Sequence, residues 1–348
     1  MRAVLRILAA LSVGLLASPG PGRAQALSLG LIGGDAAGTE SVLAAEMAEL
    51  FAGAPALRVV PKSGDAGRSN LARLLTEPGT DIAFVAADAL TDAGDPGGSL
   101  LSRVTLVARL GPQEIQVVAR QDIAHLDDLA GRKVNFGPAG GSAALAAERL
   151  FKALNIAVAP QALELRASLA QLQRGAIDAV VVVGGKPVPI ISQIPSGLGI
   201  HLLPVPFAAA VEDAYLPARF DHDDYPNLIE TETSVPSLAT GMVLLAARGK
   251  NDAGADDRVA TFIEALFSRF GELDRPGHHA KWREVNLAAT LPGWTRAPVA
   301  EAWLARRPSS VGNAIEASAA GPAPLPMSED QKEALFKGFV EWQRAKRH

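Results

Sequence analysis

The 348-residue chain contains no cysteine, which excludes disulfide bridges, thiolate metal sites and cysteine nucleophiles. Aromatic residues are scarce, at 5% of the chain, and only two of them are tyrosines. No run of basic residues is present either. Proteins that bind nucleic acids use positive patches, often with aromatic platforms for the bases. These absences argue against nucleic acid as a partner.

Long apolar runs are confined to the N-terminus. Arg2 and Arg6 precede an apolar stretch at 7–17, and a Pro/Gly break then leads to Ala-Gln-Ala at 24–26. This layout is typical of a cleaved secretory signal, so we predict cleavage after Ala26 and a periplasmic location. The stretch is too short to span a bilayer comfortably, and its retention as a membrane anchor is the alternative. No later segment offers about 18 uninterrupted apolar residues. We therefore expect no membrane insertion after cleavage.

The remainder of the chain is acidic. Removing the three arginines of the first 26 residues leaves 30 basic and 37 acidic residues, a net charge of −7. An acidic surface without a basic run is a poor match for nucleic acid or for anionic membranes.

Short apolar runs alternate with helical patterns along most of the chain, which predicts βαβ units and a mainly parallel sheet. In the first block we expect strands at 27–32, 57–60 and 82–85 and helices at 39–51 and 69–75. In a second block we expect strands at 115–120, 133–136, 162–166 and 179–183 and helices at 125–130, 142–154 and 169–174. A strand at 235–247 and helices at 256–270 and 299–305 follow.

The C-terminal segment differs in composition. Residues 306–326 are rich in Pro, Ala, Gly and Ser and are typical of a linker. A capping box at 328–331 then predicts an amphipathic helix up to about Arg347. Its apolar face packs on the body of the protein or docks a partner, and the sequence leaves both open.

The most distinctive motif is VNFGPAGGSAALAAERLF at 134–151. A strand ends in Gly-Pro, passes through Gly-Gly-Ser and enters a helix. The first N–H groups of a helix lack intrahelical partners, so this turn can hold an anion. The alternative is a tight turn in which Ser142 is simply the helix N-cap.

Four stretches together resemble a known family. They are LGLIGGDAAGTESVLAAEMAEL, VVPKSGDAGRSNLARLL with DIAFVAADAL, LDDLAGRKVNFGPAGGSAALAAERLF, and GAIDAVVVVGGKPVPII. In order and spacing they are similar to the TAXI-type solute receptors of TRAP transporters, which pass substrates to an ion-driven permease. The resemblance covers about residues 27–305.

The resemblance implies an α/β fold of the two-lobe, type II periplasmic binding protein kind, each lobe a mainly parallel sheet flanked by helices. A small solute lies in the cleft between the lobes, and the permease is the membrane partner. The predicted divisions are a signal peptide at 1–26, lobe 1 at 27–112, lobe 2 at 113–235, the return to lobe 1 at 236–305, and the linker and C-terminal helix at 306–348.

Carried over residue by residue, the resemblance places ligand contacts at glycines, hydroxyls and two charged groups near strand ends. They are Gly38, Thr39, Ser63, Gly64, Asp88, Gly140, Gly141, Ser142, Gly184, Gly185 and Lys186. Thr39 and Ser142 have N-capping as an alternative role, and Asp88 either binds a ligand amine or caps a helix. Lys186 pairs with a ligand carboxylate or is solvated. No cofactor or metal is implied.

Two departures from the family bear on the ligand. Ala37 and Glu40 flank Gly38-Thr39, where the family has an aromatic residue, and Ala86-Ala87 replaces polar residues. The sequence therefore predicts a small, anionic organic solute, carboxylate or amino-acid-like, without naming it; a less polar carboxylate is equally open. The chain lacks a Gly-x-Ser-x-Gly elbow and a His-Glu-x-x-His motif, so we expect no enzyme. A receptor that signals to a membrane sensor, or an exported enzyme using Asp88 and Lys186, remain alternatives.

Overall fold

The computed structural model describes residues 27–306 except 55, 92–101, 251 and 253. The predicted signal peptide lies outside the described residues, as do the predicted linker beyond Arg306 and the C-terminal helix. Within the described ranges, no helix is both long enough and apolar enough to cross a bilayer.

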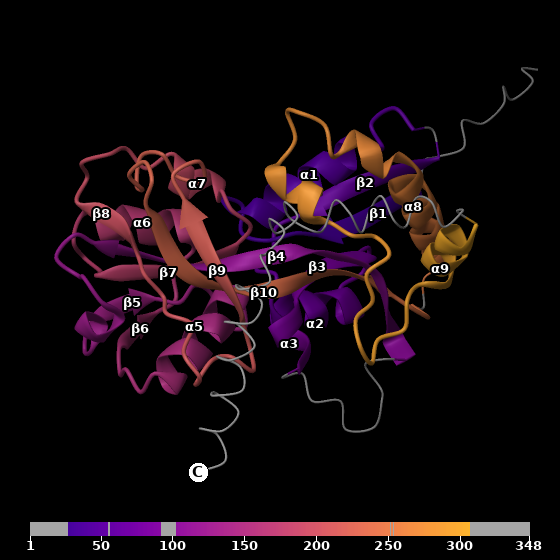
Figure 1. Cartoon of the computed structure of the whole chain (residues 1–348). Helices are drawn as coiled ribbons and strands as arrows, with labels where there is room; N and C mark the ends of the chain where they lie inside the picture. The colour runs from indigo at the N-terminus through magenta and orange to yellow at the C-terminus, as the bar shows by residue number, and fades with distance from the viewer. Residues whose placement is uncertain (1–26, 55, 92–101, 251, 253, 307–348) are drawn as a thin grey trace, which may run out of the picture.

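The described strands form one sheet in the order β2-β1-β3-β10-β4-β7-β5-β6, with β8 paired to β4 and β9 to β10 (Figure 1). Their bounds are β1 Leu27–Ile32, β2 Leu57–Lys62, β3 Ile82–Ala86, β4 Val104–Arg120, β5 Lys133–Asn135, β6 Ala159–Gln161, β7 Ala179–Gly184, β8 Ile200–Leu203, β9 Leu216–Asp221 and β10 Ser234–Ala247.

The two long strands β4 and β10 connect the halves of the sheet. They run antiparallel, from Val104 opposite Ala247 to Ile115 opposite Leu238. On one side of this pair, β1, β2 and β3 are parallel to one another, and β3 runs antiparallel to β10. On the other side, β5, β6 and β7 are parallel to one another, and β7 runs antiparallel to β4. We call these halves the first lobe (β1–β3) and the second lobe (β5–β7).

Helices cover both faces of each half, as expected for parallel strands that are buried on both sides. Strand β7 illustrates this, since all of its residues, Ala-Val-Val-Val-Val-Gly, are buried. The helices are α1 Thr39–Glu49, α2 Arg68–Thr76, α3 Ala87–Thr91, α5 Ser142–Ala153, α6 Leu165–Gln173, α7 Pro189–Ser192, α8 Ala255–Arg269 and α9 Pro298–Ala305, with 3-10 turns η1 Leu126–Leu129, η2 Phe270–Glu272 and η3 Ala280–Glu284.

The chain returns to the first lobe after β10. Helices α8 and α9 pack on the core that contains β1 and α1, where Phe262 stacks on Phe51 with ring centroids 5.3 Å apart. Trp303 of α9 meets Phe267 edge to face. Figure 1 shows the orange and yellow C-terminal elements beside the indigo N-terminal ones.

This topology confirms the predicted fold class and most of the predicted elements. The strand predicted at 162–166 is wrong, because the strand is β6 at 159–161 and α6 already begins at Leu165. The short strands β8 and β9 were not predicted. Residues 112 and 235, where the lobes were predicted to divide, lie inside β4 and β10, so those boundaries stay predictions.

Candidate functional site

The candidate site is a cavity between the two lobes, at the ends of strands from both. In open α/β sheets, ligands bind outside the carboxyl ends of the strands. The first lobe contributes the turn after β1, the start of α1 and the turn after β2; the second contributes the turn after β5, the start of α5, the start of α6 and β7. The lining residues are Gly34, Asp35, Gly38, Glu40, Asp65, Asn135, Gly137, Pro138, Gly141, Ser142, Ala143, Leu163, Leu165 and Val181 to Val183.

The cavity is small, about 50 Å³. A water molecule needs roughly 10–15 Å³ of such space, whereas small-molecule pockets hold about 300–1,000 Å³. The two lobes therefore lie close together at this cavity, and we call this the closed arrangement.

The first contact that closes the lobes joins the Gly-Gly-Ser turn to the start of α2. The backbone N–H of Ser142 donates to the carbonyl of Asp65 at 2.9 Å, and that of Ser69 donates to the carbonyl of Gly140 at 3.4 Å. Gly67 lies so close that a Cβ atom there would be 2.2 Å from the oxygen of Gly140. Only a residue without a side chain fits at this position.

A second contact joins the start of α1 and the preceding turn to the second lobe. The hydroxyl of Thr39, fully buried, donates to the carbonyl of Gly185 at 2.5 Å. The carboxylate of Asp35 accepts a hydrogen bond from the N–H of Leu165 at 3.1 Å. Asp35 thus occupies the N-terminus of α6, where a negative charge is favoured.

The structure brings several of the predicted site residues together. Gly38, Gly141 and Ser142 line the cavity. Thr39 and Gly185 form the contact just described, and Gly140 accepts from Ser69. The backbone at Gly184 lies beside Thr39, because a Cβ there would be 3.6 Å from the threonine oxygen. Contact of these residues with a ligand stays a prediction.

Other predicted residues do not reach this cavity. Ser63 is exposed, and its carbonyl accepts from Arg73. Gly64 packs tightly under Asn70, whose side-chain oxygen would be 2.3 Å from a Cβ at Gly64. Neither residue lines the cavity between the lobes.

The two predicted charged contacts also have other neighbours. Asp88 is buried in a separate cavity, with Arg149 at 3.9 Å. The ammonium of Lys186 donates to Asp224 at 2.8 Å and to the carbonyl of Arg219 at 2.9 Å, outside the lining. The structure thus gives Lys186 a carboxylate partner within the protein.

Three carboxylates that sequence reasoning did not select line the cavity: Asp35, Glu40 and Asp65. Asp35 and Asp65 each occur in a Gly-Asp-Ala sequence directly after a strand, which is a signal that was available. Glu40 was noted only as a departure from the resembling family. Its side chain is the least exposed of the three.

Glu40 is 3% exposed, and its Oε1 atom has no hydrogen-bond partner among the described residues. The pKa of Glu40 is raised to about 7, mainly by burial. A hydrogen bond from its own backbone N–H lowers this pKa, and the charges of Asp35 and Glu114 raise it further. The charge of the nearby Lys281 lowers the pKa, as the smallest of these effects. Lys281 is itself buried and donates to Glu114 at 2.7 Å and Glu284 at 2.8 Å.

We expect Glu40→Gln to change how stability depends on pH. A carboxyl whose pKa is higher in the folded state stabilises the fold fully below its unfolded pKa of 4.5, and this is lost as the pH rises through about 7. The shift corresponds to about 3 kcal/mol. Urea unfolding should find the variant close to the wild type at pH 4.5 and more stable by up to this amount at pH 8. Parallel pH profiles of the two proteins would contradict this assignment.

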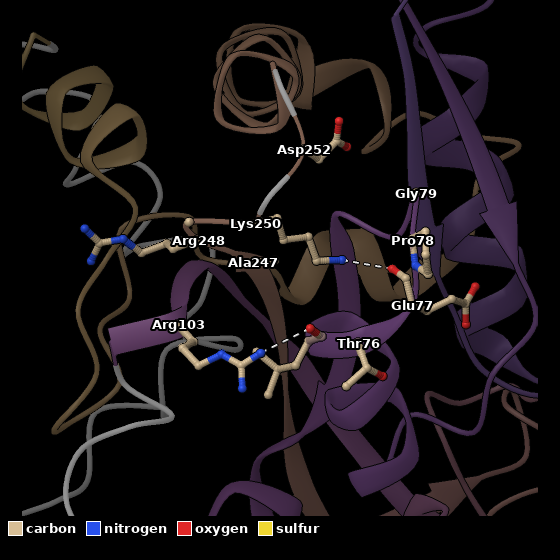
Figure 2. A pocket seen from close by; sticks show the side chains of 11 residues that line it. Thr76, Glu77, Pro78, Gly79, Arg103, Ala247, Arg248, Lys250 and Asp252 are labelled. Carbon is tan, nitrogen blue, oxygen red and sulfur yellow. Dashed lines mark hydrogen bonds between the residues drawn. The ribbon is translucent and has the colours of Figure 1, made fainter.

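A larger cavity, about 710 Å³, lies at another edge of the first lobe (Figure 2). Two of its three cationic side chains bind protein groups: Lys250 donates to the carbonyl of Glu77 at 3.0 Å, and Arg103 donates to that of Leu75 at 3.2 Å. Arg73 and then Lys62 lower the pKa of Glu77 to about 2. None of the predicted site residues lines this groove, and the second lobe contributes nothing to it. The cavity between the lobes is therefore the better candidate.

Among the described residues, no three histidine, aspartate or glutamate side chains gather in a way that would hold a metal ion.

The chain matches one family of sequences and is similar to several solved structures. The sequence model described as the NMT1-like family matches residues 36–294. The alkanesulfonate-binding protein SsuA from Xanthomonas axonopodis pv. citri is 16% identical, with 86% of this chain and 92% of that chain covered and a TM-score of 0.44. An ancestral arginine-binding protein is 15% identical. The match covers 75% of this chain and 98% of that chain, also with a TM-score of 0.44. The amino acid transporter binding protein AbpA from Streptococcus pneumoniae is 14% identical. The match covers 72% of this chain and 92% of that chain, with a TM-score of 0.39.

Proposed function

The chain belongs to the NMT1-like family, and on that premise we propose that it is a receptor that captures a small organic solute between its two lobes and delivers it to a membrane permease. The closed cleft is the observation that carries this proposal. Turns at the strand ends of both lobes meet there through Ser142, Asp65, Thr39 and Gly185. Because the cavity is too small for a solute, capture requires the lobes to separate and close again about β4 and β10.

The resemblance noted in the sequence supports a permease of the TRAP type and a periplasmic location. The second candidate is a receptor that presents its liganded form to a membrane sensor. Both use the same cleft, so the partner distinguishes them. A permease encoded beside this protein favours transport, and a sensor kinase favours signalling. Both proposals exclude turnover, so a bound solute should be recovered unchanged.

The charge of the solute depends on the groups that line the cleft. The sequence predicted an anion held by the Gly-Gly-Ser turn. In the closed cleft, the N–H of Ser142 is bound to Asp65 and the N–H of Leu165 to Asp35. The described lining residues include three carboxylates and no lysine, arginine or histidine. The proposed solute is therefore a small organic molecule whose charge depends on these groups.

The proposal is tested by a thermal-shift screen on protein refolded to remove any bound solute. The panel contains amines, amino acids, carboxylates, sulfonates and phosphonates. A ligand at 100 times its dissociation constant stabilises the folded state by about 2.7 kcal/mol. For a chain of this size, the melting temperature should rise by several degrees, at about 2 °C or more per kcal/mol. A folded protein that no compound shifts would contradict a receptor for such solutes.

A further inference from the structure

We propose that the cleft selects a small organic cation, a protonated amine or guanidinium group carried on a short apolar body. This inference rests on the proposed function and specifies its ligand. The charged end of the solute lies against Glu40, Asp35 and Asp65, and the apolar body lies against Val181 to Val183 and Leu165.

The first support is the charge of the lining. Asp35, Glu40 and Asp65 face the cavity from the first lobe, and among its described lining residues there is no cationic side chain. Glu164 adds a fourth carboxyl beside the lining residues Leu163 and Leu165. Its pKa is raised, first by a hydrogen bond with Asp35 and then by burial and by the charges of Asp35 and Asp65. A further negative charge placed here would be repelled by those of these carboxyls that are ionised.

The second, independent support is the state of Glu40. This side chain is almost fully buried, lines the cavity and leaves Oε1 without a hydrogen-bond partner among the described residues. A buried carboxylate oxygen without a donor is costly, so a positively charged donor that enters the cavity relieves this cost. The nearest amine, Lys281, already donates to Glu114 and Glu284.

Asp35 and Asp65 are held in fixed positions. Asp35 accepts from the N–H of Ala37 at 2.8 Å and from Leu165 at 3.1 Å, and Asp65 accepts from Gly67 at 3.1 Å. Carboxylates oriented in this way by the backbone lose little freedom when a cation binds. Opposite them, the valines of β7 offer an apolar wall.

The test compares matched probes by isothermal titration calorimetry. Pentylamine and agmatine are the cations, pentanoate and glutarate the anions, and pentanol the neutral control. We expect saturable binding of the cations only. Glu40→Gln should weaken their binding at least tenfold, equivalent to about 1.4 kcal/mol. Glu49→Gln, an exposed change in the same helix, should leave it unchanged.

A second readout separates a direct role of Glu40 from a structural one. Glu40 faces the carboxyls of Asp35 and Glu114 and the ammonium of Lys281, and Asp65 lines the same cavity. A cation stabilises ionised Glu40, so binding at pH 6.5 should release protons, followed with a pH electrode in weakly buffered solution. Glu40→Gln should abolish this release, and Asp35→Asn should weaken binding in the same direction. Both variants are checked for cooperative unfolding.

The outcomes distinguish the two levels of the proposal. Saturable binding of pentanoate or glutarate that Glu40→Gln does not change would overturn the cation inference and leave the proposed function standing. Cation binding that survives Glu40→Gln would also overturn it. A folded protein that binds neither set, and that no compound of the wider panel stabilises, would overturn both.

Discussion

Replacing Gly67 by valine is expected to hold the lobes apart and to weaken solute binding by 100-fold or more, while both lobes remain folded. A Cβ at Gly67 would lie 2.2 Å from the carbonyl oxygen of Gly140 and 2.5 Å from the carbonyl carbon of Gly141. These are backbone atoms of the other lobe, so no side-chain rotation relieves the clash. Gly67 has φ −107°, which valine adopts without strain. The substitution therefore acts mainly on closure, with a smaller cost at the N-cap of α2.

Small-angle X-ray scattering measures this effect without a ligand, because open lobes increase the radius of gyration. Binding of whichever compound shifts the wild type in the thermal screen gives the loss of affinity. Gly271→Val is the matched control, since a Cβ at Gly271 meets no atom within 4 Å. Identical scattering and affinity in Gly67→Val and in the wild type would show that the closed contact is not part of binding.

Lys281→Met is expected to destabilise the fold by about 3–5 kcal/mol, the cost of removing one partner from a buried ion pair. The ammonium of Lys281 is 2.7 Å from Glu114 and 2.8 Å from Glu284, and the lysine and Glu114 are 1% and 3% exposed. Without the ammonium, Glu114 is left buried beside Glu40. Burial already raises the pKa of Glu114, and Lys281 is the main group that opposes this.

Urea unfolding at pH 7 gives the free-energy difference. Arg283→Met is the control, because its ion pair with Asp274 spans 3.9 Å on the surface, and such pairs contribute about 0–1 kcal/mol. The double variant Lys281→Met/Glu114→Gln should regain part of the loss, since it removes the uncompensated charge as well. Equal stabilities of the Lys281 variant and the wild type would contradict the buried network.

Several turns that line the candidate cavity were predictable from the sequence, whereas the partners of the charged side chains were not. Glycine-rich turns after β1 and before α5 were recognised, and the structure places Gly38, Gly141 and Ser142 on the cavity wall. The partners of charged side chains could not be predicted in this way. Lys186 pairs with Asp224, 38 residues further along, and Asp35 caps a helix 130 residues away. No local pattern encodes such pairs.

The errors in the fold have local causes. Gly111-Pro112 has the composition of a turn, yet it lies inside β4, where the register with β10 shifts at Gly241 and Met242. A bulge accommodates residues there that would otherwise break a strand. Strand β8 is short and pairs only with the end of β4, and β9 pairs only with the end of β10.

The sequence by itself determined the alternation of strands and helices, because buried parallel strands need continuous apolar runs such as Ala-Val-Val-Val-Val at 179–183 and each helix carries its own periodicity. It also determined which turns lie at strand ends. Only the tertiary structure decided that Asp35, Glu40 and Asp65 meet in one cavity with β7 as their apolar wall. The reason is physical: burial and charge at a site are sums over neighbours in space. Pairing of β1 with β2 inside the first lobe brings the three carboxyls together, and contact between the lobes adds β7.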